Sequence, residues 1–391
     1  MNIGRTVFSQ MMDCIPKRQF QKIVQHYHGD CRVREFSCLD QFLCLAFAQL
    51  TARESLRDIE ACLSAQPEKL YHLGIRGRVR RSTLADANEK RDWRIFSELA
   101  HVLIQTARQL YTNDALIDEL KEVAYAFDST TISLCLKLFP WAKFRRRKGG
   151  IKLHTLINLR GNIPSFIWIS PARMHDVLAL DTLSFEPGAY YIFDRAYFDF
   201  TRLYRIHQSG AFYIVRDKKN ICFQVIESRP VDPLDYGSGL RCDQTIRFTS
   251  AKGAREYPEL LRRIKYYVAD SNQTYTIFTN KFLVPALAIS QFYHARWQIE
   301  LFFKWIKQHL RIKVFLGTSF NAVSTQIWIA MSVYVIVAII KKRFMLTHDP
   351  YRIMRILSLH LFEQVDIQQL LTETVSEKSE SEFCNQLSLF D

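Results

Sequence analysis

The sequence predicts an α/β protein in which a helical N-terminal region precedes a β-sheet domain. Three observations support this fold class. Residues 1–115 contain strongly apolar segments such as CLDQFLCLAFAQL and IFSELAHVLIQTARQLY with little Gly or Pro, which is typical of a helical bundle. Two aromatic runs, VAYAFD and AYYIFD, predict strands that are buried on both faces. Five further strand-like runs lie before residue 280, separated by Pro, Gly, Asp and Asn.

Each of the two aromatic runs ends in an aspartate. Asp128 follows VAYAF and Asp194 follows AYYIF, so we expect each carboxylate at the end of a buried strand. Taken singly, either aspartate is also typical of a turn residue or a helix cap. Between them, KLHTLINL and PSFIWI around Arg160-Gly161-Asn162 predict a hairpin that continues the Asp128 strand, and HDVLALDTLSF predicts a crossover helix into the Asp194 strand.

A long interval of 105 residues separates Asp194 from Glu300. This is far more than a strand-to-helix connection needs. It contains the strand-like runs AFYIVR, ICFQVI, TIRFTS, IKYYVA and YTIFTN. We therefore expect a small, mostly β insertion at about residues 200–288.

The segment AISQFYHARWQIELFFKWIKQHL predicts one amphipathic helix with a polar stripe. Tyr293, Arg296, Glu300 and Lys307 stand at relative positions 0, 3, 7 and 14, so their side chains fall within an arc of roughly 60°. A core helix with a solvated polar seam would show the same stripe. If the helix packs beside the sheet, Glu300 joins Asp128 and Asp194 in one pocket.

Three carboxylates in one pocket repel one another and raise one another's pKa. Two Mg²⁺ or Mn²⁺ ions would remove this conflict, because hard oxygen ligands suit hard cations. Two such ions about 3.5–4 Å apart can activate a water or a 3′-hydroxyl and stabilise the leaving oxygen of a phosphoryl transfer. The carboxylates Asp128, Asp194 and Glu300 are therefore the candidate catalytic and metal-binding residues.

The order Asp128, Asp194, Glu300, with Tyr293-x2-Arg296-x3-Glu300-x6-Lys307, resembles bacterial insertion-sequence transposases of the DDE class that carry a Tyr-Arg-Glu-Lys signature. The stretches KGGIKLHTLINLRGNIPSF, FDRAYFDFTRLYRIHQSGAFYIVRDKKN and RWQIELFFKWIKQHLRIKVFLGTS extend this resemblance, which covers about residues 80–343.

The resemblance implies a ribonuclease-H-like catalytic domain over residues 116–345, with the β insertion, after a DNA-binding domain over residues 1–115 that recognises terminal inverted repeats. It implies cut-and-paste transposition, with cleavage at the element ends through a hairpin and transfer of the 3′ ends to target DNA. Tyr293, Arg296 and Lys307 would then hold the DNA backbone, and a homodimer would form on DNA.

Composition independently favours a nucleic-acid partner. The chain has 53 Lys and Arg against 39 Asp and Glu, which gives a net charge of +14 and a pI of about 9.3. One basic cluster, Arg145-Arg146-Arg147-Lys148, predicts a flexible loop that clamps DNA close to the first aspartate, or a solvated loop that aids solubility. A second, RGRVRR at residues 76–81, fits a phosphate contact in which Ser82 caps a helix, or an ordinary charged linker.

The end of the chain changes character. Residues 346–372 predict a helical segment, and residues 373–391 are polar and acidic, as in disordered tails. The last residues resemble the short motif by which bacterial replication proteins dock on the sliding clamp, with Gln386, Leu387, Leu389 and Phe390 as contacts. A terminal segment that folds back on its own core is the alternative.

We expect a cytoplasmic, nucleoid-associated bacterial protein without a membrane partner. No signal sequence precedes the first helix, and the apolar run from Ile327 to Ile340 is shorter than the ~20 residues of a bilayer span, so it predicts a buried helix on the sheet. Two rival functions stay open: a structure-specific nuclease without strand transfer, and a catalytically silent DNA-binding regulator. The intact triad argues against the regulator, because crowded carboxylates cost stability.

Overall fold

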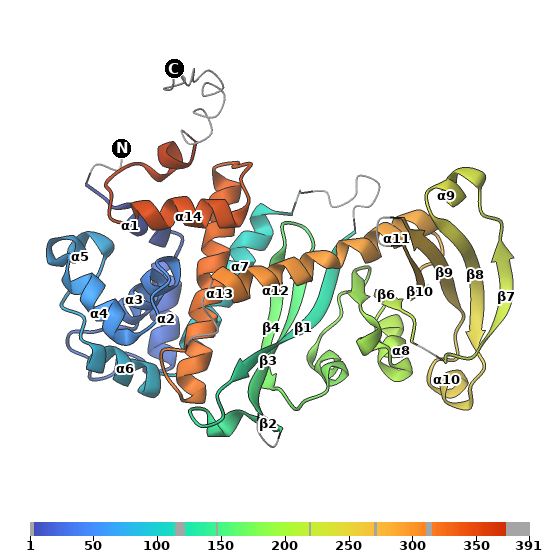
Figure 1. Cartoon of the computed structure of the whole chain (residues 1–391), viewed down its shortest axis with the longest axis horizontal. Coiled ribbons are helices and arrows are strands. Elements are labelled where there is room, and N and C mark those ends of the chain that lie inside the picture. Colours follow the sequence, from blue (N-terminus) through green and yellow to red (C-terminus); the bar gives the residue numbers. More distant parts are fainter. Residues whose placement is uncertain are drawn as a thin grey trace, which may run out of the picture. The chain divides into compact units, whose positions relative to one another are not determined.

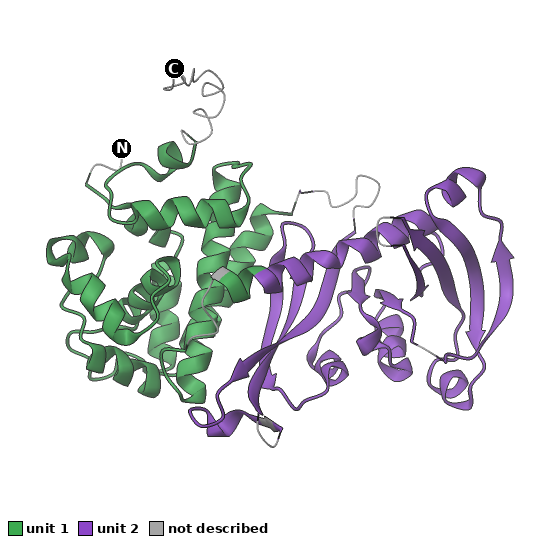
Figure 2. Cartoon of the chain, in the orientation of Figure 1, with its two compact units in different colours: residues 1–112, 305–391 green, residues 113–304 purple. Residues whose placement is uncertain are grey.

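The structure is a computed structural model that describes residues 4–112, 114, 122–145, 148–218, 220–269, 272–309 and 315–372. They fall into two compact units (Figure 2). The helical unit comprises residues 1–112 and 305–391, and the sheet unit comprises residues 113–304. This division differs from the domain boundary expected at residue 345, because it falls within the helix that follows Arg296.

The helical unit contains the N-terminal helices together with two helices from the end of the chain (Figure 1). Its helices are α1 (Val7–Met12), α2 (Lys17–His26), α3 (Cys38–Leu50), α4 (Leu56–Ser64), α5 (Pro67–Leu73), α6 (Arg81–Lys90), α7 (Arg94–Leu110), α13 (Phe320–Arg343) and α14 (Pro350–His360). A capping box starts α3, in which the Ser37 hydroxyl accepts from Asp40 N and the Asp40 carboxylate accepts from Ser37 N.

Helix α13 forms the centre of the helical unit. By length and composition it could cross a membrane, but its most apolar window is completely buried among the other elements. It packs mainly against α7 and also against α3, α6 and α14. Burial of this run agrees with the sequence-based expectation, and within its own unit the helix packs on other helices. An apolar helix fits a sheet or a helical bundle equally well, so its composition does not select its neighbours.

The sheet unit is built on a ten-stranded mixed sheet. Its strands are β1 (Ala124–Leu134), β2 (Lys143–Arg145), β3 (Lys148–Asn158), β4 (Ile163–Pro171), β5 (Tyr190–Phe193), β6 (Phe212–Arg216), β7 (Phe223–Arg229), β8 (Leu240–Phe248), β9 (Leu261–Val268) and β10 (Gln273–Thr279). The strand order is β2-β3-β1-β5-β6-β10-β9-β8-β7, and β4 also pairs with β3, along Ile151–Asn158. Its helices are α8 (Phe200–Gln208), α9 (Pro233–Gly237), α10 (Ala251–Glu256), α11 (Ala286–Ala295) and α12 (Trp297–His309).

Strand β1 joins two kinds of pairing at the centre of this sheet. It runs antiparallel to β3 and parallel to β5, which in turn runs parallel to β6. The predicted hairpin is confirmed, since β3 and β4 pair across a turn at Gly161 and Asn162 with φ of +72° and +55°. Helix α8 provides the crossover from β5 to β6 and packs on β6.

Two details of the expected sheet are wrong. The crossover before β5 is a 3₁₀ helix of seven residues, Asp176–Thr182, and not an α-helix. The run AFYIVR supplies β6, a parallel strand of the central sheet, and β10 pairs with β6 so that β7–β10 extend the same sheet. The predicted strands of the insertion exist, but they do not form a separate subdomain. Short apolar runs carry no information on their pairing partners.

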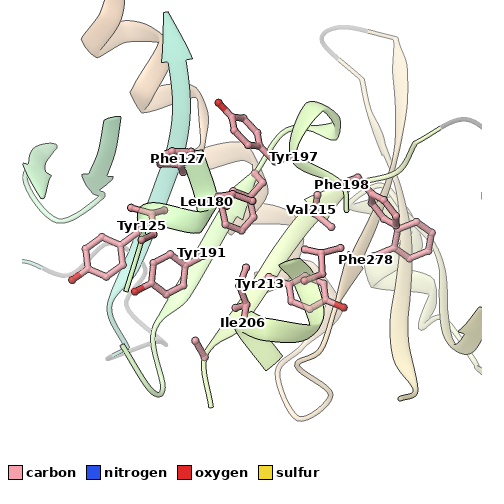
Figure 3. Packing of buried hydrophobic residues seen from close by; sticks show 14 of the residues in the cluster. Tyr125, Phe127, Leu180, Tyr191, Tyr197, Phe198, Ile206, Tyr213, Val215 and Phe278 are labelled. Carbon is pink, nitrogen blue, oxygen red and sulfur yellow. The ribbon is translucent and has the colours of Figure 1, made fainter. Parts of the chain in front are cut away.

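Aromatic side chains fill the layer beside β1 and β5 (Figure 3). Tyr125 stacks on Tyr191 with 5.3 Å between ring centroids, and Phe127 meets the edges of Phe193 and Tyr197 at 6.3 and 5.2 Å. All five rings are at most 1% exposed. Each ring buries a large apolar area, so the layer fixes the relative position of the two strands that precede Asp128 and Asp194.

A buried ion pair anchors the segment that leads from β10 into α11. Arg262 in β9 binds both oxygens of Asp243 in β8, at 2.8 and 2.6 Å. Its remaining Nη1 donates to the carbonyls of Lys281, Phe282 and Val284. Both charged side chains are less than 10% exposed. The pair therefore ties the insertion strands to the start of the helix that carries Tyr293.

Candidate active site

The two aspartates lie side by side in the sheet. β1 and β5 pair in parallel up to Phe127 and Phe193, so the next residue of each strand is the aspartate. Asp194 directly follows β5, as expected. Asp128, however, is not at a strand end, because β1 continues to Leu134 in pairing with β3. Asp128 and Asp194 therefore lie side by side at the point where β5 ends and β1 continues without pairing to β5.

A polar network holds the Asp128 carboxylate. Ser129 N donates to Asp128 Oδ1 at 2.8 Å, and the buried Tyr197 hydroxyl lies 3.5 Å from the same oxygen. Ser129 Oγ donates to Asp176 Oδ1 at 2.5 Å, and Lys152 Nζ lies 3.0 Å from that oxygen. Sequence reasoning missed Asp176 and Lys152, because nothing in HDVLALDT or GGIKLH marks a contact between β3 and the 3₁₀ helix.

The expected single helix over residues 288–310 is two helices. α11 ends at Ala295 and α12 begins at Trp297, with Arg296 in a tight turn between them. The turn is bonded by Arg296 N to Tyr293 O and by Ile299 N to Arg296 O, in a 3₁₀ pattern. The expectation of one continuous helix is therefore wrong at Arg296. Even so, the side chains of Tyr293 and Arg296 reach both aspartates.

Tyr293 and Arg296 make these contacts. The Tyr293 hydroxyl lies 3.5 Å from Asp194 Oδ1. Arg296 Nη2 lies 2.5 Å from Glu300 Oε1, and Nη1 lies 3.6 Å from Asp128 Oδ2. The Arg296 side chain is only 13% exposed. It thus bridges a carboxylate on β1 and a carboxylate on α12.

Negative charge at the site exceeds what Arg296 compensates. The pKa of Asp128 is raised to about 6, chiefly by burial and also by the charges of Asp194 and Glu300, against the opposing effects of Ser129 N–H and Arg296. Burial likewise raises the pKa of Tyr293 to about 12, so its hydroxyl stays a neutral donor at physiological pH. The three carboxylates form one electrostatically coupled group that favours additional positive charge.

The negative charge of the three carboxylates and their oxygen donor atoms suit a hard divalent cation. Carboxylate oxygens are the ligands that Mg²⁺ and Mn²⁺ prefer. Across the described residues, no three His, Cys, Asp or Glu side chains are already arranged around one metal-sized position. The pairing of Glu300 with Arg296 accounts for this in part, because the carboxylate must leave the guanidinium to turn toward an ion.

The other predicted DNA contacts are only partly placed. Lys307 lies on α12, two turns after Glu300, and is half-buried. Arg145 ends β2 and Lys148 begins β3, both exposed, whereas Arg146 and Arg147 lie outside the described residues. Lys148 is seven residues along β3 from Thr155, the partner of Asp128, or about 23 Å. Lys148 therefore lies far along the strand from the partner of Asp128, and the expected DNA contact of this cluster stays a prediction.

The residues of the predicted clamp motif, Gln386, Leu387, Leu389 and Phe390, also lie outside the described part of the chain.

The raised pKa of Asp128 has a measurable consequence for stability. The folded chain binds this proton more tightly than the unfolded chain, so the stabilising contribution is complete below about pH 4 and is lost as the pH rises through about 6. Asp128→Asn should therefore exceed wild type by about 1–3 kcal/mol in unfolding free energy at pH 8, with no difference near pH 4. Chemical denaturation in EDTA at both pH values measures this.

Asp235→Asn, which changes a carboxylate in α9, serves as the control and should follow wild type at both pH values. A variant at Asp128 that is less stable than wild type at pH 8 would contradict the electrostatic account.

Comparison with known proteins identifies the family of the chain. The family model described as "Transposase DDE domain" matches residues 119–336, and one described as "Domain of unknown function (DUF4372)" matches residues 3–76. The chain is 36% identical over 287 residues to "Putative transposase y4zB" of Sinorhizobium fredii, covering 73% of this chain and 78% of the relative.

Two further relatives are more distant. "Probable transposase for insertion sequence element IS5377" of Geobacillus stearothermophilus is 29% identical over 54% of each chain. "Putative transposase for insertion sequence element IS4SA" of Synechocystis is 25% identical over 66% of this chain and 71% of the relative. The first family match covers more than half of the chain, and the chain therefore belongs to the DDE-domain transposases.

Proposed function

We propose that this transposase binds the terminal inverted repeats of its insertion sequence, cleaves at the element ends through a hairpin, and transfers the 3′ ends to target DNA. The observation that carries the proposal is the convergence of three carboxylates, in which Arg296 contacts both Asp128 and Glu300 while Tyr293 contacts Asp194. Such a site suits two-metal phosphoryl transfer. The complete Tyr-Arg-Glu-Lys signature, Tyr293 to Lys307, supports the cut-and-paste type.

The strand order supports a ribonuclease-H-like catalytic domain. Antiparallel β4, β3 and β1 are followed by parallel β5 and β6, which gives the order β4-β3-β1-β5-β6. Asp128 lies in β1, and Asp194 directly follows β5. In this arrangement the long interval before α11 adds strands to the far edge without disturbing the two aspartates.

Each residue of the site has a role that its chemistry permits. Asp128, Asp194 and Glu300 would hold two Mg²⁺ or Mn²⁺ ions, which would activate the attacking oxygen and stabilise the leaving one. Arg296 releases Glu300 and turns its guanidinium to a phosphate oxygen of the DNA. Its Nε makes no hydrogen bond within the described structure and is free to donate. The Tyr293 hydroxyl donates a hydrogen bond to phosphate, and Lys307 adds positive charge on α12, the helix that carries Glu300.

The remaining partners follow from the same proposal. Residues 1–115 bind the terminal repeats, the chain dimerises on DNA, and the exposed Arg145 and Lys148, with Arg146 and Arg147, bind the DNA backbone away from the carboxylates. The tail docks on a sliding clamp, and unchanged clamp pull-down after deletion of residues 385–391 would refute that contact.

The proposal predicts that Glu300→Gln separates binding from chemistry. The variant should bind DNA that carries the element ends as wild type does, because it keeps the basic surfaces. Cleavage and joining should fall by roughly a thousandfold or more, because a metal-binding carboxylate is lost. Gel assays of cleavage and strand transfer in Mg²⁺ measure both activities.

Glu227→Gln, at an exposed carboxylate on β7, is the matched control and should retain activity. Cutting without joining by wild type would favour the structure-specific nuclease, and binding without either activity would favour the regulator.

A further inference from the structure

A segment of the helical unit that the proposed chemistry does not use carries a dense positive charge. Residues 76–81, which lead from α5 into the first residue of α6, are here called the arginine connector (Figure 1). All four of its arginines are exposed: Arg76, Arg78, Arg80 and Arg81. Ile75 and Val79 are each 2% exposed, so two buried anchors fix the segment and direct the arginines outward.

These arginines differ from others in the same unit. Arg5 pairs with Asp13 at 2.7 Å, and Arg94 pairs with Asp92 at 2.5 Å. Within the described residues, no side chain of the arginine connector forms an ion pair or hydrogen bond. Ser82 does not cap α6 as the sequence suggested, because it is the second residue of the helix and Arg80 is the N-cap. Four uncompensated, adjacent cations repel one another, and a polyanion would relieve that repulsion.

The sequence of the connector favours one mode of binding a polyanion. The backbone φ of Gly77 lies outside the left-handed region, and a Cβ on Gly77 would meet no atom within 4 Å. The fold therefore does not require glycine at this position. A residue without a side chain between two arginines lets the backbone approach the floor of a narrow groove, and the narrow minor groove of A·T-rich DNA attracts arginine.

We propose that Arg76-Gly77-Arg78 enters the minor groove of A·T-rich duplex DNA while Arg80 and Arg81 contact the flanking phosphates. Arginine suits this role better than lysine, because its guanidinium is more weakly hydrated and loses less on entering the groove. The inference rests on the proposed function for its DNA partner, and it assigns a DNA-reading surface in the helical unit.

The test measures binding of the full-length chain to labelled duplexes of 20 base pairs in EDTA by fluorescence anisotropy. Three duplexes are compared: one with a central A·T tract, one with G·C, and one with I·C, which presents the minor groove of A·T and most of the major groove of G·C. Wild type should bind the A·T and I·C duplexes roughly tenfold more tightly than G·C.

The variants distinguish recognition of the minor groove from simple attraction between arginine and phosphate. Arg76→Lys with Arg78→Lys keeps the charge and should retain affinity for G·C while losing the preference for A·T and I·C. The corresponding double alanine variant should also lose affinity for all three duplexes by roughly tenfold. Gly77→Ala, which the fold accommodates, should lower the preference. Arg355→Ala, at an exposed arginine on α14 outside residues 1–115, is the control and should bind as wild type.

Several outcomes would overturn the inference. Equal binding of the A·T and G·C duplexes, an I·C duplex that behaves like G·C, or equally strong competition by duplex RNA would each exclude minor-groove reading. The assay needs no catalysis, so its result is independent of the proposed chemistry. A chain with the A·T preference but no cleavage refutes only the transposition chemistry. A chain that transposes without the preference refutes only the connector.

Discussion

Repulsion among three carboxylates is the constraint on which the site depends. Asp128, Asp194 and Glu300 share a half-buried region in which solvent screens their charges poorly. Arg296 offsets part of this charge by contacting Asp128 and Glu300. Burial, together with the charges of Asp194 and Glu300, raises the pKa of Asp128, so that added positive charge would stabilise the site. In this account, the state with Arg296 inserted precedes metal and DNA binding.

The rest of the sheet unit keeps this unfavourable cluster in place. Stacked aromatic rings fix β1 against β5, so the two aspartates cannot move apart without exposing a buried layer. The Arg262–Asp243 pair anchors the segment before α11, and Tyr275 of β10 packs against Tyr293 with 6.0 Å between ring centroids. The added strands thus support α11, the helix that carries Tyr293 and leads to Arg296, which gives the insertion a structural role beyond any DNA contact.

Sequence predicted the elements more reliably than their neighbours. The aromatic strands, the hairpin at Gly161 and the later β run could be recognised, because each is encoded by local composition and turn residues. The partner of α13 could not be predicted, since a uniformly apolar helix fits either kind of core. The break at Arg296 and the Asp176–Ser129 contact depend on tertiary packing and have no local signature.

The most direct test of the account is calorimetric titration of Mg²⁺ into the full chain at pH 7.5 without DNA. If the coupled carboxylates form the cation site, wild type should show saturable binding, and both Asp194→Asn and Glu300→Gln should weaken it strongly. The exposed-site variant Glu227→Gln should bind as wild type does. Identical titrations for wild type and the two carboxylate variants would show that Mg²⁺ binds elsewhere, and would contradict the account.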